Sequence, residues 1–263
     1  MVLSDDYKER YSLLQTMGFN SESHLYIVND SLCKIYVKTI DLPNREYYVD
    51  KLMKLNYINN AIWPQDKIYI SGKFSGIVME YKRGFENLAN IFKTLSFENA
   101  ITMGIQLSQT LKQIHEEGFI IGDIHGDNII TNRKEFCFCD LDGMKCDLNN
   151  TEAKTLYSIM YNDYSPSISD NQMTDNIKLL TYILSVLYHY NLESELANKG
   201  TEFLLKLVCN LNLPMDIKNI MMNIFNLGID QPYFYEYSSL LSNSYEQVEY
   251  DRQRIAKKVK ILY

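Results

Sequence analysis

Short apolar runs bounded by turn residues characterise the first third of the chain. We expect β-strands at His24–Val28, Leu32–Lys38, Lys67–Ser71 and Gly76–Tyr81. The dipeptides Asn29-Asp30 and Ser71-Gly72 are typical of tight turns beside such strands. One helix is predicted between the strands, over residues 43–58, because Asp41 can cap it and Pro43 suits its first turn.

The pattern becomes helical after Gly84. Apolar residues recur with a period near 3.6 over residues 96–117, and Gly118 follows the last of them. The segment 174–190 is apolar nearly all round, which predicts a buried helix. Further helices are expected within 192–242, and the mixed charges of 245–260 predict a surface helix. Strands followed by helices indicate an α+β fold.

Composition and charge limit the class of protein. The 263 residues are 46% hydrophobic and 22% charged, as expected of a folded chain, and the net charge of −7 argues against a nucleic-acid binder. The five cysteines show no metal-site spacing, which favours free thiols in a reducing compartment. The first residues are polar and the longest apolar run, Leu179–Tyr190, is too short to span a bilayer. We therefore expect a cytoplasmic protein without a membrane partner.

Two acids and an amide carry the strongest chemical signal. Asp123 and Asn128 lie five positions apart on a turn-prone segment, and the apolar run Phe136–Cys139 then leads into Asp140. A phosphoryl-transfer site needs a carboxylate near the acceptor hydroxyl and oxygen ligands for the metal that neutralises the phosphates. An ordinary Asp-Gly turn between two elements is the alternative explanation.

These motifs and the order of elements resemble the protein-kinase-like superfamily, from about Gly18 to Tyr190. The resemblance implies a bilobal fold, with an N-lobe of antiparallel sheet plus one helix at 1–81 and a helical C-lobe at 82–263. It implies ATP and Mg²⁺ as cofactors, with Asp123 orienting or deprotonating the acceptor hydroxyl and with Asn128 and Asp140 holding the metal. Asp142, in the triplet Asp140-Leu141-Asp142, is an alternative or second ligand.

The resemblance also implies a lysine that contacts the nucleotide phosphates. Lys34 takes this place in the strand Leu32-Cys33-Lys34-Ile35-Tyr36, and Lys38 is its competitor. Glu46, early on the predicted helix, is the expected partner carboxylate of Lys34, with Asp50 as the alternative. Lys34 and Glu46 therefore join Asp123 as the expected catalytic residues.

Other nucleotide contacts are implied by weaker matches. Met79 takes the gatekeeper place at the end of a strand, and the backbone groups of Glu80, Tyr81 and Lys82 would meet the adenine edge. The phosphate-covering loop keeps only Gly18 of its usual glycines. Downstream, the segment Tyr164–Ser167 resembles the end of an activation segment, and Asp175 matches the structural acid of the following helix.

Departures from the family pattern bear on regulation and acceptor. Ile121-Gly122 stands where protein kinases have a His-Arg pair, so we expect activity that does not require activation-loop phosphorylation. His125 replaces the usual lysine, a form similar to small-molecule kinases. The resemblance favours a divergent, bacterial-type serine/threonine protein kinase. An aminoglycoside- or choline-type kinase and a pseudokinase binding module are the alternatives. The hydroxyl acceptor, a protein or a small molecule, is not specified by the sequence.

Overall fold

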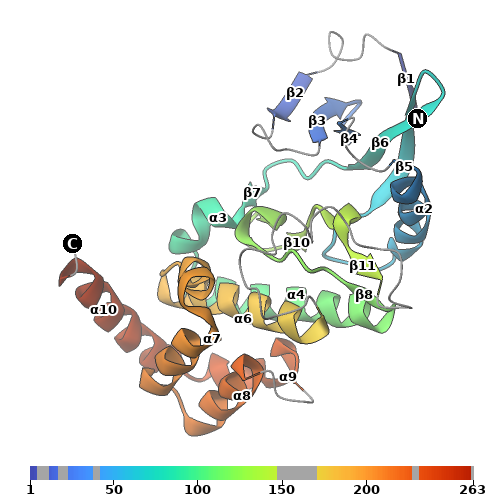
Figure 1. Cartoon of the computed structure of the whole chain (residues 1–263). Helices are drawn as coiled ribbons and strands as arrows, with labels where there is room; N and C mark the ends of the chain where they lie inside the picture. The colour runs from blue at the N-terminus through green and yellow to red at the C-terminus, as the bar shows by residue number, and fades with distance from the viewer. Residues whose placement is uncertain (5–11, 17–22, 38–41, 147–170, 227–230, 262–263) are drawn as a thin grey trace. The chain divides into compact units, whose positions relative to one another are not determined.

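The computed structural model describes residues 1–4, 12–16, 23–37, 42–146, 171–226 and 231–261. Most of the longer strands lie in the first third of the chain and most of the helices follow them, which confirms the predicted α+β class. The chain forms two compact units (Figure 1). The first contains Met1–Phe85 and Cys139–Asp142, and the second contains Glu86–Phe138 and Gly143–Tyr263. The expected division at 81/82 lies four residues before this boundary, and the expected C-lobe included Cys139–Asp142.

A six-stranded sheet forms the first unit. The order is β1-β5-β6-β4-β3-β2, antiparallel except where β1 runs parallel to β5. Its bounds are β1 Val2–Leu3, β2 Ser12–Thr16, β3 Ser23–Val28, β4 Ser31–Tyr36, β5 Pro64–Ile70 and β6 Lys73–Glu80. The four predicted strands are therefore confirmed with shifted ends, whereas β1 and β2 were not predicted.

Side chains on both faces of the central strand β4 are buried. Cys33 and Ile35 belong to the apolar core of the sheet, with Val28, Ile68 and Val78. Lys34 and Tyr36 alternate with them and are also buried. On the neighbouring strand, a Cβ at Gly76 would lie 2.1 Å from the carbonyl oxygen of Lys34, so glycine is required there.

Among the described residues of the first unit, helix α2 accompanies this sheet. Helix α2 spans Leu42–Leu52 and continues into the short 3₁₀ turn η1, Met53–Leu55. The predicted helix at 43–58 is therefore confirmed, although its last residues leave the helix. Its apolar side, with Val49 and Leu52 fully buried, packs against β5 and β6.

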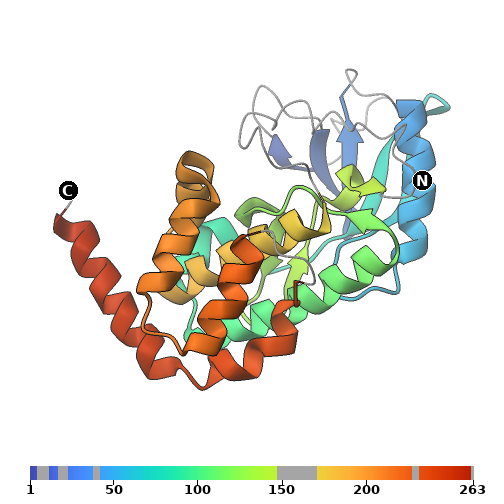
Figure 2. The ribbon, with the colours of Figure 1, turned by 60° about the horizontal axis from the view of Figure 1, so that its bottom comes forward.

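Helices make up most of the second unit. They are α3 Leu88–Ile91, α4 Phe97–Glu116, α6 Gln172–Tyr188, α7 Leu192–Asn210, α8 Met215–Phe225, α9 Phe234–Ser242 and α10 Tyr245–Ile261, and the 3₁₀ turn η2 is Phe92–Thr94. Helix α4 lies beside α6 (Figure 2) and also packs on α9. A Cβ at Gly104 would lie 2.4 Å from the ring of Phe234, so this glycine permits the close contact of α4 with α9. The predicted long helices are confirmed.

Short strands surround the segment 121–128. Strand β8, Phe119–Ile120, pairs with β11, Lys145–Cys146, just before the segment. Strand β9, Ile129–Thr131, follows it and lies between β10, Phe136–Phe138, and β7, Glu86–Asn87. The 3₁₀ turns η3, Gly126–Asn128, and η4, Leu141–Gly143, complete these connections. Paired strands therefore fix both ends of the candidate loop.

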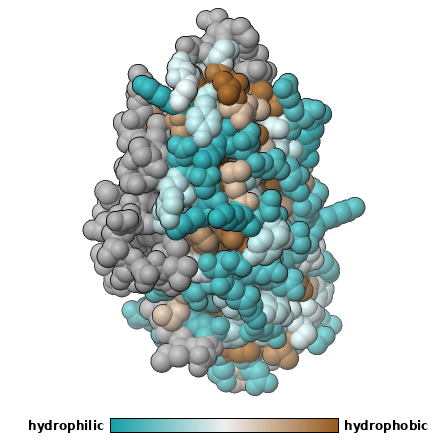
Figure 3. Space-filling model, turned by 90° about the vertical axis from the view of Figure 1, so that its right-hand side faces the viewer, coloured by the Kyte–Doolittle hydropathy of each residue, from teal (hydrophilic) through white to brown (hydrophobic). Residues whose placement is uncertain are grey.

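The surface that Figure 3 displays is mainly hydrophilic, with small separate hydrophobic areas. The large apolar side chains that are exposed come from separate parts of the described chain, for example Val2, Tyr57 and Met215. Within the described ranges, no helix combines the length and the apolar character needed to cross a membrane.

Candidate functional site

The loop 121–128 takes its shape from one glycine and two buried isoleucines. Gly122 has φ +72°, a left-handed conformation that glycine adopts without steric cost. Ile121 and Ile124 are buried on either side of Asp123, which remains partly exposed. Gly126 packs against the backbone of Ala89 in α3, where a Cβ would approach to 3.0 Å. The loop is thus anchored by apolar contacts, and Asp123 is left accessible.

Asp123 and Asn128 are in direct contact. The Asn128 side-chain amide donates hydrogen bonds to Asp123 Oδ2 at 2.8 Å and to the Asp123 carbonyl oxygen at 3.1 Å. Asn128 is buried, whereas the side chain of Asp123 keeps 24% exposure. The structure therefore brings this predicted pair together, with the carboxylate open to solvent on one side.

His125 makes a second contact with the same carboxylate. Its Nε2 lies 3.2 Å from Asp123 Oδ2, and its Nδ1 accepts from the backbone N–H of Asp127 at 3.2 Å. Burial acts to lower the pKa of His125, but the hydrogen bond and negative charge of Asp123 outweigh it, so the pKa is raised above its ordinary value. His125 is thus a hydrogen-bond donor that orients the Asp123 carboxylate.

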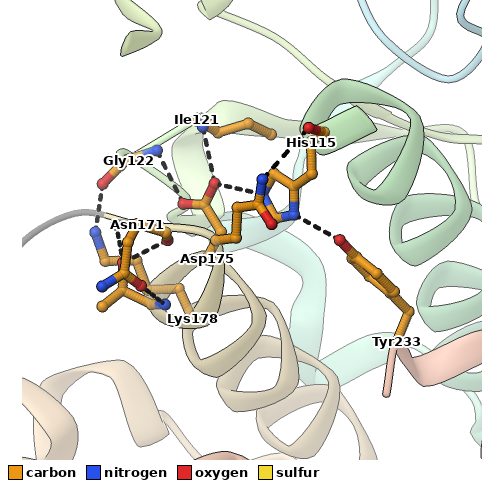
Figure 4. Close-up of polar contacts among 9 residues, drawn as sticks. His115, Ile121, Gly122, Asn171, Asp175, Lys178 and Tyr233 are labelled. Atoms are coloured by element: carbon orange, nitrogen blue, oxygen red, sulfur yellow. Dashed lines mark hydrogen bonds and ion pairs between the residues drawn. The ribbon is translucent and has the colours of Figure 1, made fainter. Parts of the chain in front are cut away.

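Asp175 holds the loop from beneath (Figure 4). Its fully buried carboxylate accepts from the backbone N–H groups of Ile121 at 2.8 Å and Gly122 at 2.9 Å. His115 Nε2 lies 3.1 Å from the same carboxylate, and His115 Nδ1 lies 2.8 Å from the hydroxyl of Tyr233. The structural role expected for Asp175 is confirmed, and its partners on α4 and before α9 extend the network.

Helix α6 also contacts the loop through Lys178. The Lys178 ammonium donates to the carbonyl oxygen of Gly122, one turn along the helix from Asp175 (Figure 4). Asn171 and Thr174 form a capping box at the start of α6, with Asp175 in the first turn. The beginning of α6 therefore binds both the N–H and the carbonyl of Gly122, the residue before Asp123.

The first unit contains a buried ion cluster centred on Lys34. The Lys34 ammonium donates to Asp140 and, at 2.7 Å, to Asp142 Oδ1. Burial acts to lower the pKa of Lys34, but the two carboxylates raise it well above its usual range, so the lysine stays charged. The predicted lysine is thus in contact with both acids of the Asp-Leu-Asp triplet.

The two acids of the triplet differ in environment. Asp142 has a side-chain exposure of 1%, and it accepts from the hydroxyl of Tyr36 at 2.7 Å and lies 3.5 Å from Arg45. Burial acts to raise the pKa of Asp142, but Lys34 and Arg45 hold it below its usual range. Asp140 is 29% exposed, and its backbone has φ +60°, which is uncommon outside glycine.

Glu46 does not form the expected pair with Lys34, so this prediction was wrong. Glu46 Oε1 accepts from the hydroxyl of Tyr69 at 2.7 Å and lies 3.3 Å from the ammonium of Lys67. Asp50, the alternative, also pairs with Lys67, at 2.8 Å. Successive residues on a helix point about 100° apart, and it is Arg45 rather than Glu46 that turns toward the Lys34 cluster.

The expected adenine-contacting residues lie at the end of β6. Met79 is buried and pairs with Leu32 of β4, and Glu80 is exposed at the end of the strand. Tyr81 follows the strand and is partly exposed. Their contact with a nucleotide stays a prediction. Gly18, Lys38 and Tyr164–Ser167 lie outside the described residues.

Only a few of the described side chains are suitable as ligands for Mg²⁺. Among the described residues, no group of three or more His, Cys, Asp or Glu side chains gathers as a preformed metal cage. Mg²⁺ usually keeps several waters and needs only one or two protein carboxylates or amides. The accessible carboxylate of Asp140 meets that need, whereas Asp142 is enclosed by protein donors. Asp140 is therefore the better candidate ligand, and the amide oxygen of Asn128 is a second candidate.

Several residues of these clusters were missed from the sequence. Tyr36 could have been found, because it lies two positions after Lys34 and so shares its face of the strand. Arg45, His115, Lys178 and Tyr233 gave no signal, since their partners are distant in the chain. The roles of these residues follow only from the folded structure.

No family model matches the chain, and no curated protein matches it in sequence.

Proposed function

We propose that this chain is an ATP- and Mg²⁺-dependent phosphotransferase with a protein-kinase-like bilobal fold. A largely antiparallel sheet with helix α2, in the described part of the first unit, and a mainly helical second unit support the fold. The cluster of Lys34, Asp140 and Asp142 and the loop of Asp123 and Asn128 support the activity.

Each group has a separate task in the proposed reaction. The Lys34 ammonium, which is charged and has little freedom to move, binds nucleotide phosphate oxygens. Asp140 of the first unit and Asn128 of the second are each a candidate ligand of Mg²⁺, and the ion would neutralise charge on the phosphates. Asp123 accepts a hydrogen bond, and then the proton, from the acceptor hydroxyl. Asn128 and His125 keep the Asp123 carboxylate in one orientation.

The observation that carries the proposal is the state of Asp123. Its carboxylate is held by two side chains of its own loop, and the backbone just before it is fixed by a buried acid. A plain Asp-Gly turn would not need such support. An accessible, oriented carboxylate is what a group that receives a proton requires.

Calorimetric titration with ATP tests the donor half of the proposal. The wild-type protein should bind ATP more tightly with Mg²⁺ than without it, and Asp140→Asn should lose most of this difference. Asp30→Asn is the matched control, because Asp30 is an exposed aspartate of the same unit. Binding that is unaffected by Mg²⁺ in the wild-type protein would contradict the proposal.

The acceptor is proposed to be a serine or threonine hydroxyl of a protein. A small-molecule hydroxyl is the second candidate, favoured by the contact of His125 with Asp123 Oδ2 at 3.2 Å, where protein kinases have a lysine. ATP turnover that requires a metabolite would select the small-molecule class. Autophosphorylation that is lost in Asp123→Asn would select the protein class.

A further inference from the structure

We propose that Asp142 is the positioning residue for Lys34, and that α2 acts on this lysine through Arg45 rather than through Glu46. The inference deepens the proposed function, on which it rests. It assigns the second acid of the Asp-Leu-Asp triplet to holding the phosphate-binding lysine, and leaves metal binding to Asp140.

Both oxygens of the Asp142 carboxylate have protein partners. Oδ1 accepts from the Lys34 ammonium at 2.7 Å, and Oδ2 accepts from the Tyr36 hydroxyl at 2.7 Å and lies 3.5 Å from Arg45. A buried carboxylate is stable only when protein donors satisfy it in this way. Both oxygens are therefore engaged by the protein.

Asp140 and Asp142 differ in the exposure of their side chains. Asp140 shares the same ammonium but keeps 29% of its side chain exposed, against 1% for Asp142. A ligand that enters from solvent can thus reach Asp140. If Asp140 were to bind a metal ion, Asp142 would still hold Lys34 in place, so the two acids would have separable tasks.

A series of side-chain contacts connects α2 to Lys34. The Arg45 guanidinium lies over the ring of Tyr36, 4.5 Å from its centroid, and pairs with Asp142. Burial and the nearby Asp142 charge raise the pKa of Tyr36 well above its usual value, so its hydroxyl stays protonated and donates. Arg45, Tyr36 and Asp142 form one continuous set of contacts with Lys34. Glu46 instead contacts β5 through Lys67 and Tyr69.

The first experiment needs no nucleotide. The ¹H–¹⁵N signal of the Lys34 side-chain ammonium is recorded in the metal-free protein and assigned by its loss in Lys34→Arg. Asp142→Asn should shift and broaden this signal, and Arg45→Gln should shift it less. Asp30→Asn, an exposed control in the same unit, should leave it in place. A larger shift in Glu46→Gln than in Asp142→Asn would overturn the inference, and so would an unchanged signal in Asp142→Asn.

The second experiment separates positioning from metal binding in the active enzyme. Asp142→Asn should raise the KM for Mg-ATP about tenfold or more, because it breaks a buried ion pair. The Mg²⁺ concentration for half-maximal activity should stay the same in Asp142→Asn and rise in Asp140→Asn. An equal rise in both variants would make Asp142 a metal ligand and refute the inference.

If the wild type transfers no phosphate, the proposed function fails, while the ammonium signal still tests the placement of Lys34. Should Asp142→Asn fail to fold, Arg45→Gln supplies both measurements.

Discussion

At the scale of single residues, the structure explains which polar groups are charged and why. Asp123 accepts from both Asn128 and His125, so two side chains hold its carboxylate in one orientation. Lys34 is buried but keeps its charge, because two carboxylates flank it. In each of the two candidate groups, the surrounding residues therefore hold the key polar side chain in one position.

The pKa of His125 gives the first prediction at this scale. Asp123 raises the pKa, so Asp123→Asn should lower it in the metal-free protein, and Asp127→Asn should lower it less. A group whose pKa is raised by folding stabilises the fold below its unfolded pKa of about 6.5. This stability is lost as the pH rises through the folded value. An NMR titration of the imidazole protons measures both shifts, and a wild-type pKa below 6.5 would contradict the contact.

At the scale of elements, α6 is the support of the candidate loop. Its capping box places Asp175 in the first turn, and Asp175 satisfies the N–H groups of Ile121 and Gly122. His115 of α4 joins the same carboxylate, and Tyr233 links it to the start of α9. Three helices thus meet where the loop begins, which makes the position of Asp123 depend on their packing.

Removal of the Asp175 carboxylate should be costly. Asp175→Ala leaves two backbone N–H groups and His115 without their buried acceptor, so the free energy of unfolding should fall by about 3 kcal/mol or more. Asp216→Ala is a matched control, because Asp216 lies in the first turn of α8 but is exposed. Urea unfolding of the three proteins measures the difference. A loss in Asp175→Ala no larger than in the control would refute the supporting role.

At the scale of the whole molecule, the sequence predicted elements better than contacts. The strands β3 to β6 and the helices α4 and α6 were predicted, because local hydrophobic periodicity encodes them. The two-residue strands β1, β7, β8 and β11 were not, since so short a segment has no period. Asp123 and Asn128 were predicted to act together because they are near in sequence. The rotation of α2 that presents Arg45 instead of Glu46 depends on packing against the sheet, and no local pattern shows it.

The activity proposed for this chain is the transfer of a phosphoryl group from ATP. The most direct test is the transfer of radiolabelled phosphate from [γ-³²P]ATP with Mg²⁺, to generic protein acceptors and to small hydroxyl compounds. Asp123→Asn is compared with Asp127→Asn, the same change at an exposed aspartate of the same loop. Transfer is expected from the wild type and from Asp127→Asn, with a loss of about a hundredfold or more in Asp123→Asn. Equal transfer by the wild type and Asp123→Asn, or no transfer by the wild type to either kind of acceptor, would contradict the proposed activity.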